Sequence, residues 1–455
     1  MIKSTNAIVI GGGFAGLAAA WRLGGLGIET LLFERRKTLG GRASSFLDPA
    51  TNCEIDNGQH IVLGACTELL QFLGELEKNS SIAWRDCYYL WSGDRGGRFV
   101  RLAPSAFLPP SLQFFPAFLQ YSHLTIAERA RALAILLKVK RMDERELQRL
   151  ESVTFGRWLE EQRAPKKLIS RFFEPVVIGA LNESPDRASA RAALWILKNG
   201  FLTSAANARL GVPSIPLSDF FDHSSQEKYT KHKVTIRIGE DVAEINRFDS
   251  GDWTVRTNAG SYTSKIVILA IPWHALTRVL PPNISTAIPG LAEFTKVNPS
   301  PIQTVHYFFD RDVALPIPEV AILERTAHWA FDRYQATGRE ADRGHIAVVV
   351  SAAHELSKKT REEIEIILLA DLREVFPSLQ KREPRRMLMT TEWSATYSAA
   401  PGVEMLRIPE ATPCRGLFVA GDTCRTGWPA TMESAVRSGN AAAGAAHRYI
   451  QSIIQ

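Results

Sequence analysis

The fold is decided in residues 7–16, which read AIVIGGGFAG. An apolar run rich in β-branched residues stops at a glycine cluster and passes into an Ala-rich segment, which predicts a strand, a tight turn and a helix. Gly11 permits the sharp turn, Gly13 lets the backbone approach a pyrophosphate, and Gly16 allows the helix to pack closely on the strand. The start of the helix, around Ala15, presents N–H groups and a positive dipole end. We therefore expect a dinucleotide cofactor at this turn.

A second predicted strand, residues 29–33, ends at Glu34, which lies 18 residues beyond Gly16. This is the spacing expected for an acid that binds a ribose. A carboxylate at this point accepts hydrogen bonds from both ribose hydroxyls and repels a 2′-phosphate, so the pattern favours an unphosphorylated adenosine dinucleotide over NADP. The alternative is a chance glycine turn that is followed by a surface Glu.

The chain of 455 residues is long enough for two domains, and its composition, 45% hydrophobic and 22% charged, is typical of a folded protein. It contains 54 Lys and Arg against 48 Asp and Glu, a formal charge of +6, with a pI near 9.0. This mild basicity includes no Lys/Arg block or tail, so it does not favour binding to nucleic acid. It suits loose attraction to an anionic membrane surface.

The five cysteines have no metal-ligand spacing, and the sequence predicts no metal site. An odd, sparse set in a chain of this length indicates reduced thiols in a cytoplasm. The N-terminal apolar run is short and continues into the glycine turn, so we interpret it as a strand and not as a signal peptide. No run reaches the ~18 apolar residues that span a bilayer. We expect a cytoplasmic protein that can associate peripherally with the inner face of the cell membrane.

The chain changes character between residues 101 and 221. Residues 101–119 are aromatic, apolar and broken by prolines, which excludes one continuous helix. Residues 125–150 have the pattern of an amphipathic helix. Further helices are predicted at about 155–162, 165–178 and 188–198. This block predicts an inserted, mainly helical lobe.

Strand patterns return after residue 234, and residues 265–272, KIVILAIP, form an apolar run that ends in proline as a buried parallel strand does. Further strands are predicted between 280 and 390, with a covering helix at 362–375. The predicted fold class is α/β, a Rossmann-like cofactor domain with an inserted α+β substrate domain that includes the helical lobe. The predicted cofactor domain comprises residues 1–95, 225–280 and 395–455, and the substrate domain comprises residues 96–224 and 281–394.

The C-terminal segment carries the second strong pattern. Residues 416–422 form a predicted strand that runs into Gly421-Asp422, and residues 427–433, GWPATME, begin a long helix. Small residues repeat along this helix, so it is expected to lie very close to either the first helix or a cofactor. We interpret Glu433 as a favourable charge at the start of its own helix.

Together these blocks resemble the FAD-dependent amine oxidase and phytoene desaturase superfamily. The resemblance rests on the GxGxxG turn, the acid after the second strand, the turn GGR at residues 40–42, the strand that ends in proline, and the Gly-Asp pair ahead of a helix. It implies FAD as the cofactor and a cofactor domain of the glutathione-reductase-2 type. The residues that it assigns to FAD are Gly11, Gly13, Ala15, Gly16, Glu34, Arg35, Gly41, Arg42, Val242, Gly421, Asp422, Thr431 and Met432.

By this resemblance, Glu34 holds the adenosine ribose and Arg42 lies near the pyrophosphate. Val242 brings its backbone to the adenine, and Asp422 binds the ribityl–phosphate region. The helix start at residues 431–432 faces the N1/O2 edge of the flavin. A positive helix end at that edge stabilises negative charge on a reduced flavin.

Three segments are similar to a narrower, squalene-associated branch, the bacterial hydroxysqualene dehydroxylases of hopanoid precursor synthesis. They are residues 56–64, 173–182 and 426–439. Trp428 and Tyr397 depart from the branch, which is expected to have an aliphatic residue and Phe at these positions. The resemblance implies reductive removal of an allylic hydroxyl from a C30 isoprenoid lipid, which gives squalene.

In that reaction the hydroxyl must leave as water, so an acid or an ordered water has to protonate it. His60 is the titratable side chain nominated for this catalytic role, against the alternative of a structural His after a turn. The hydride would come from flavin N5. Trp393, Tyr397 and Trp428 are predicted to line the substrate pocket, where aromatic faces would stabilise an allylic cation. Ordinary core packing is the alternative for each of them.

A reductase also needs electrons, and the absence of a second GxGxxG leaves open an external redox partner or NAD(P)H binding directly at the flavin. Residues 107–119 and the basic helix after them either give a lipid access from the membrane or form a buried hairpin. Three other functions stay open. They are a carotenoid-type desaturase, with hydride moving from substrate to flavin, an amine oxidase, and an isoprenoid-binding carrier without flavin. Intact Glu34, Arg42 and Asp422 argue against the carrier.

Overall fold

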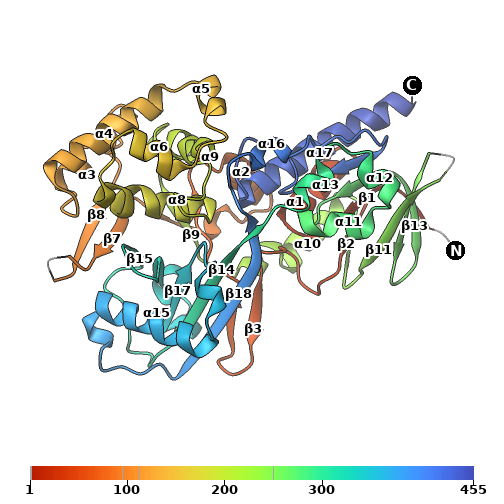
Figure 1. Cartoon of the computed structure of the whole chain (residues 1–455). Coiled ribbons are helices and arrows are strands. Elements are labelled where there is room, and N and C mark those ends of the chain that lie inside the picture. The colour runs from red at the N-terminus through yellow and green to blue at the C-terminus, as the bar shows by residue number, and fades with distance from the viewer. Residues whose placement is uncertain (1–2, 95, 111, 249–250, 455) are drawn as a thin grey trace.

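The computed structural model describes residues 3–94, 96–110, 112–248 and 251–454. Its chain forms two seven-stranded sheets and a helical lobe (Figure 1). The first sheet lies at the right of Figure 1, near both termini, and the second sheet lies at the lower left beneath the lobe. The predicted α/β class is therefore confirmed, and so is the predicted helical lobe.

The first sheet has the strand order β10-β2-β1-β13-β12-β11, with β19 also beside β13. Strands β10, β2, β1, β13 and β19 run parallel, whereas β12 and β11 form an antiparallel hairpin against β13. The central strands are buried on both faces, as their continuous apolar sequences predict. The bounds are β1 Lys3–Ile10, β2 Thr30–Glu34, β10 Val234–Ile238, β11 Val242–Arg247, β12 Trp253–Thr257, β13 Ser261–Leu269 and β19 Leu417–Val419.

Helices α1 (Phe14–Gly25) and α17 (Met432–Ile454) pack against one another and against this sheet. A Cβ at Gly439 of α17 would lie 2.2 Å from the backbone oxygen of Ala15, so only glycine permits this crossing. The small residues of α17 thus serve mainly to bring it close to the first helix, one of the two predicted neighbours. Helix α10 (His223–Lys231) lies nearby, where the hydroxyl of Tyr229 donates to the backbone oxygen of Leu17.

The second sheet has the strand order β18-β14-β17-β16-β15-β7-β8. Helix α15 (Arg361–Val375) covers one face, as the sequence predicts. Strand β7 pairs with β15 of this sheet, although it lies within residues 1–95, the predicted first part of the cofactor domain. Strand β8, within the predicted substrate domain, pairs with β7. The bounds are β7 Tyr88–Ser92, β8 Arg98–Leu102, β14 Pro299–Phe308, β15 Glu319–Ile322, β16 Trp329–Asp332, β17 His345–Val350 and β18 Arg386–Tyr397.

The helical lobe differs from the prediction in one respect. Residues 125–150 form two helices, because Asp143 begins a second N-terminal cap just after the first helix ends. Both helices start with a capping box, Thr125 with Glu128 and Asp143 with Glu146, which satisfies the first free N–H groups of each. The lobe contains α3 Phe115–Gln120, α4 Ile126–Arg141, α5 Glu144–Arg149, α6 Phe155–Glu161, α7 Lys166–Leu168, α8 Glu174–Leu181 and α9 Ala190–Ile196.

Shorter elements connect these parts. Strands β3 (Ser45–Asp48) and β4 (Cys53–Asp56) form a hairpin, and β5, β9 and β6 form a small sheet. The remaining bounds are β5 Val62–Leu63, β6 Ile82–Arg85, β9 Leu210–Pro213, α2 Thr67–Glu75, α11 Leu276–Val279, α12 Pro282–Thr286, α13 Leu291–Phe294, α14 Arg333–Thr337 and α16 Val403–Leu406. Among the described residues, no helix combines the length and apolar character needed to cross a bilayer.

Candidate active site

A cavity of about 520 Å³ lies between the two sheets. Its lining at one end comes from the loops that follow β1, β2 and β13 and from the start of α17, and this is the cofactor end. Its lining at the other end comes from β14, β16, β17, β18 and α8, and this is the sheet end. Twelve of the thirteen residues predicted to bind FAD line this cavity, all except Gly16, and His60 lines it as well.

The glycine turn after β1 has the three different constraints that its pattern predicts. Gly11 has φ +109°, and a Cβ there would lie 2.4 Å from the oxygen of Ala270. A Cβ at Gly16 would lie 1.9 Å from the oxygen of Gly11, so Gly16 serves the contact between helix and strand without facing the cavity. A Cβ at Gly13 would meet only the Cα of Gly41, at 3.8 Å, and would otherwise enter the cavity. The turn therefore leaves a cradle that a side chain at Gly13 would fill.

The Glu34 carboxylate is buried at the end of β2 and lines the cofactor end. Its oxygens accept hydrogen bonds from the backbone N–H of Gly12 and of Arg36, both at 2.7 Å. These bonds hold the carboxylate beside the glycine turn, while each oxygen keeps further acceptor capacity for a hydroxyl. Arg35 and the backbone of Val242 line the same end.

Arg42 and Asp422 meet across the cofactor end, although they are far apart in the sequence. The Arg42 guanidinium lies 2.5 Å from a carboxylate oxygen of Asp422, and it also donates to the backbone oxygen of Ala395 at 2.9 Å. Gly41 (φ +65°) and Gly421 (φ +97°) permit the turns that bring the two side chains together. The pair combines the partly exposed cation of Arg42 with the buried anion of Asp422. A pyrophosphate would be bound by such a cation, and the hydroxyls of a polyol would donate to such an anion.

The start of α17 points at the same cavity, because Thr431 and Met432 line it. Glu433 lies in the first turn of α17, as interpreted from the sequence, and it has a second role. It is fully buried, and its carboxylate accepts the backbone N–H of Glu68 at 3.2 Å and of Leu69 at 2.7 Å. Glu433 thus caps the neighbouring helix α2. Desolvation by burial raises the pKa of this carboxyl group.

Arg407 is a structural residue of the site that sequence reasoning missed. Its side chain is fully buried and donates to the backbone oxygens of Asp422 (3.1 Å) and Trp428 (2.6 Å) and to the hydroxyl of Ser434 (3.1 Å). It thereby fixes the whole C-terminal block around the cavity. No motif surrounds Arg407, and an isolated Arg between loops gives no signal in a single sequence.

The loop of residues 57–60 carries polar groups from the cofactor end toward the sheet end. His60 is partly buried, and its Nδ1 lies 2.8 Å from the backbone oxygen of Gly58. Asn57 donates to the carboxylate of Glu392 on β18 at 2.9 Å and accepts from the hydroxyl of Thr390 at 2.9 Å. Burial lowers the pKa of His60, so its imidazole is neutral at pH 7.

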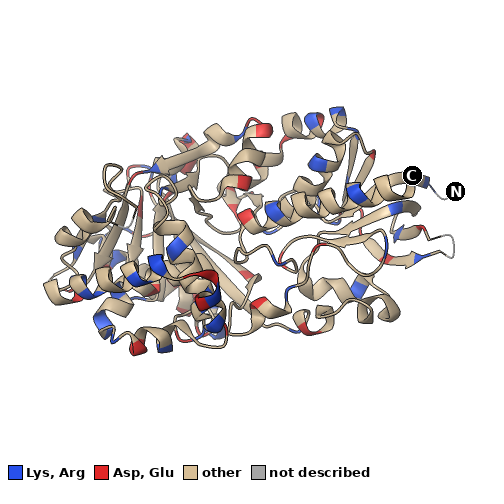
Figure 2. Cartoon of the chain, turned by 90° about the horizontal axis from the view of Figure 1, so that it is seen from above, with Lys and Arg blue, Asp and Glu red and all other residues tan. Residues whose placement is uncertain are grey.

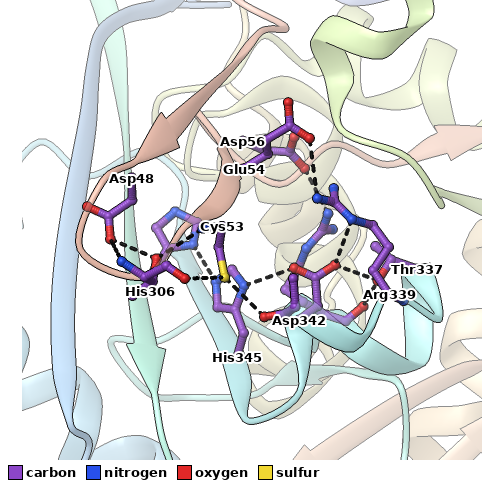
Figure 3. A network of polar contacts seen from close by, with 12 residues as sticks. Asp48, Cys53, Glu54, Asp56, His306, Thr337, Arg339, Asp342 and His345 are labelled. Atoms are coloured by element: carbon purple, nitrogen blue, oxygen red, sulfur yellow. Dashed lines mark hydrogen bonds and ion pairs between the residues drawn. The ribbon is translucent and has the colours of Figure 1, made fainter.

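Ion pairs anchor the hairpin that precedes this loop to the second sheet. Asp56, buried, pairs with the buried Arg333 at 3.0 Å, and Glu54 pairs with Arg339 at 3.3 Å. Beneath them lies a chain of buried polar groups (Figure 3), in which Nδ1 of His306 is 3.0 Å from Nε2 of His345. Burial lowers the pKa of both imidazoles.

The sheet end is mainly apolar. Its apolar lining comprises Ile61, Ala180, Ile302, Trp329, Phe331 and Val349. Asn182, at the left-handed C-cap of α8 (φ +52°), is a polar residue that was not predicted to line it. Its amide donates to the backbone oxygen of Ser300 at 2.9 Å and to the hydroxyl of Thr396 at 3.1 Å, which ties the lobe to both β14 and β18. Asn182 lies in the segment 173–182 that resembles the squalene-associated branch, but its place in the cavity could be assigned only from the structure.

The three predicted pocket aromatics lie outside this cavity. Trp393 is 59% exposed, because side chains alternate along β18 and its neighbour Glu392 takes the inward position. Tyr397 and Trp428 are buried and line a separate cavity of about 200 Å³ on the side of α9 and α16. Trp428 packs edge-on against Trp195 with ring centroids 4.9 Å apart. None of the three aromatics predicted to line the substrate pocket therefore lines the cavity that contains the predicted FAD residues.

The described residues contain no group of three or more His, Cys, Asp or Glu that could hold a metal ion. All five cysteines are free thiols. Burial raises the pKa of Cys66 and of Cys424 to about 12, so both thiols are protonated at neutral pH. The titratable groups that remain at the sheet end are His60 and Glu392 among the described residues that line it.

Comparisons with known proteins agree with this geometry. The family model for flavin containing amine oxidoreductase matches residues 14–447. The chain is 25% identical to the hydroxysqualene dehydroxylase of Sinorhizobium fredii, over 96% of this chain and 97% of that protein. It is 23% identical to the 15-cis-phytoene desaturase of Arabidopsis thaliana, over 96% of this chain and 79% of that protein.

Among solved structures, a putrescine oxidase variant from a redesign of cofactor binding superposes with a TM-score of 0.74 at 17% identity, over 99% of this chain and 100% of that one. The cradle at Gly13, the buried acid Glu34 and the pair Arg42–Asp422 fit an adenine dinucleotide. The chain therefore belongs to the flavin containing amine oxidoreductase family and is an FAD-dependent oxidoreductase.

Proposed function

We propose that this enzyme removes the hydroxyl of hydroxysqualene to give squalene, the step that supplies hopanoid and other triterpenoid synthesis. The likeness to a hydroxysqualene dehydroxylase along nearly the whole of both chains is the observation that carries this proposal. The overall reaction breaks an allylic C–O bond and forms a C–H bond. It consumes two electrons and two protons and releases one water, so an external electron donor must supply the electrons.

The cavity supports a lipid substrate because its sheet end is mainly apolar. A C30 chain bound against Ile302, Trp329 and Phe331 would exclude water from the carbon that reacts. Reduced FAD supplies the hydride when it is bound at the cofactor end. The start of α17 at residues 431–432 places a positive helix dipole toward negative charge in this part of the cavity.

Polar side chains at the sheet end would bind and protonate the leaving hydroxyl. His60 and Glu392 are the titratable pair, and Asn57 holds the Glu392 carboxylate through a hydrogen bond of 2.9 Å. The neutral imidazole of His60 uses Nδ1 at the oxygen of Gly58, so Nε2 is the atom left to meet a hydroxyl or an ordered water. We propose that His60 orients the hydroxyl, and that Nε2, which carries no proton in this tautomer, takes up a proton from an ordered water connected to solvent and passes it to the leaving hydroxyl.

A carotenoid-type desaturase is the second candidate, because phytoene desaturases match the chain over almost the same span. That reaction would move hydride in the opposite direction, from lipid to oxidised FAD. Two anaerobic incubations distinguish the candidates. Photoreduced enzyme with hydroxysqualene should form squalene, and oxidised enzyme with phytoene should leave it unchanged. Desaturated products from phytoene, without squalene in the first incubation, would favour the desaturase.

A further inference from the structure

The outer end of the helical lobe exposes an unusual set of large apolar side chains. Phe107 is 99% exposed, Ile126 82%, Leu119 60%, and Leu112 and Phe115 41% each. We call these five residues the lobe patch. They fall within twenty residues of sequence, around α3 and the start of α4, which form the left extremity of the molecule in Figure 1. Single exposed apolar residues are ordinary, but a set this dense marks an interaction surface.

Helix α3 has apolar side chains on both of its faces. Its inner residues Ala117 and Phe118 are buried in the lobe core, and the ring centroid of Phe118 lies 4.9 Å from that of Phe172. Its outer residues Phe115 and Leu119, one turn apart, face outward. The lobe core therefore buries only the inner face of α3. The outer face has no partner among the described residues of this chain.

The segment is held in place and is not a loose loop. The Arg129 guanidinium donates to the backbone oxygen of Leu124 at 2.9 Å and also to that of Leu119, which joins the first turn of α4 to the end of α3. The hydroxyl of Tyr121 donates to the backbone oxygen of Arg171 at 2.6 Å. These bonds fix the part of the lobe patch at Leu119 and Ile126 to the rest of the lobe.

The charge around the lobe patch favours an anionic partner. Residues 98–141 contain seven Lys and Arg and a single Glu, so this segment alone carries +6, which equals the formal charge of the whole chain. Figure 2 shows both Lys/Arg and Asp/Glu positions along the helices at the left end of the molecule. A second copy of this chain would bring the same positive segment against itself, which disfavours a symmetric dimer. An anionic lipid surface complements both the charge and the exposed apolar side chains.

We propose that the lobe patch docks this enzyme on the surface of an anionic bilayer, with Phe107 and Ile126 inserted at the level of the headgroups. The docked lobe contributes α8 to the cavity, since Gly179 and Ala180 of that helix line the sheet end. The same lobe would then contact the membrane and enclose the lipid substrate. This inference rests on the surface and not on the reaction, so its test and that of the proposed function can fail separately.

The test is flotation of the full-length, FAD-loaded enzyme with vesicles of phosphatidylglycerol and phosphatidylcholine, and with vesicles of phosphatidylcholine alone. We expect flotation with the anionic vesicles at about 0.05 M NaCl and a clear reduction at about 0.5 M. The double variant Phe107→Ser/Leu119→Gln should lower the partition constant at least tenfold, because it removes two large inserting side chains. Ile126→Gln serves as a second, independent variant.

The matched control is Ile366→Gln/Met405→Gln, which removes apolar side chains of 67% and 63% exposure far from the lobe patch in the sequence. It should bind vesicles as the unmodified enzyme does, and FAD absorbance and Tm should be unchanged in every variant. The proposal is overturned if the unmodified enzyme does not float, or if the control loses as much binding as the patch variants. It is also overturned if sedimentation shows self-association that the patch variants abolish, which would make a second copy the partner.

Discussion

The two ends of the cavity are built in different ways. The cofactor end is assembled from backbone turns and charges, with Gly11, Gly13 and Glu34 all supplied by the first βαβ unit. The sheet end is assembled from apolar side chains of five separate elements, with Asn57–Glu392 as a polar contact between residues 335 positions apart. The first end suits FAD, the cofactor that the family match indicates, and the second end is formed by residues outside the glycine turn. The residues that determine the fold and the cofactor therefore lie close together in the sequence, whereas those that would determine the substrate do not.

The largest expected effect comes from Gly16→Ala, which tests the local construction of the cofactor end. The added Cβ would lie 1.9 Å from the backbone oxygen of Gly11, and neither backbone can move without opening the turn. We expect a loss of at least about 3 kcal/mol in the free energy of unfolding, or no soluble protein. Thermal unfolding and FAD content measure this.

Gly74→Ala in α2 is the matched control, because a Cβ there meets nothing within 4 Å. Its unfolding free energy should stay within about 1 kcal/mol of the unmodified protein. Equal stability of the Gly16 and Gly74 variants would contradict the close packing of helix on strand.

Gly13→Val separates binding from folding at the same turn. Its backbone, φ −80° and ψ 177°, accepts a β-branched residue, and the side chain would project into the cavity. We expect FAD affinity to fall at least tenfold. The Tm of the Gly13→Val apoprotein should stay much closer to that of the unmodified apoprotein than the Tm of Gly16→Ala does. Titration of apoprotein with FAD measures the affinity. Unchanged FAD affinity would place the pyrophosphate elsewhere.

His60→Ala tests the sheet end. If His60 orients the leaving hydroxyl and passes its proton, turnover should fall about 100-fold while the FAD spectrum is retained. His60→Asn keeps a donor for the oxygen of Gly58 and distinguishes loss of loop order from loss of proton transfer. Full turnover in an FAD-loaded His60→Ala enzyme would remove His60 from the mechanism.

The smallest expected effect concerns the support beneath the loop, the buried pair His306–His345. Burial lowers the pKa of both imidazoles, so the unfolded chain binds protons below about pH 6.5 that the folded chain does not. Unfolding then takes up protons, and stability present at pH 7.5 is lost as the pH falls. We expect His306, whose pKa burial lowers well below its ordinary value, to contribute about 1 kcal/mol of this loss at pH 5.5.

His306→Gln should flatten the decline in stability between pH 7.5 and 5.5, measured by denaturant unfolding at each pH. His223→Gln, at an exposed position, should leave the decline unchanged. The charged neighbours of the pair, Asp342 and Arg333, remain in both variants. An identical decline in His306→Gln and in the unmodified protein would show that the pair does not contribute.

Much of the cofactor end could be predicted from the sequence, because each of its parts is a short motif whose spacing follows from one turn or one strand. The cap that Glu433 provides to α2 and the buried Arg407 could not be predicted, since each depends on a neighbour brought in by the fold. The break at Asp143 is different, because the capping box of Asp143 and Glu146 is a local pattern that the longer amphipathic pattern of residues 125–150 obscured. Trp393 was assigned to the wrong side of its strand because its inward neighbour was not known. A contact between two residues that are hundreds of positions apart produces no periodic pattern in a single amino-acid sequence.

One anaerobic single-turnover measurement tests the proposed reaction most directly. Enzyme whose FAD has been photoreduced is mixed with hydroxysqualene, and squalene is quantified against the FAD that becomes reoxidised. The proposed reaction predicts one squalene for each FAD reoxidised, with no squalene from enzyme left in the oxidised state. FAD that stays reduced, or reoxidation without squalene, would contradict the assignment of this cavity to removal of the allylic hydroxyl.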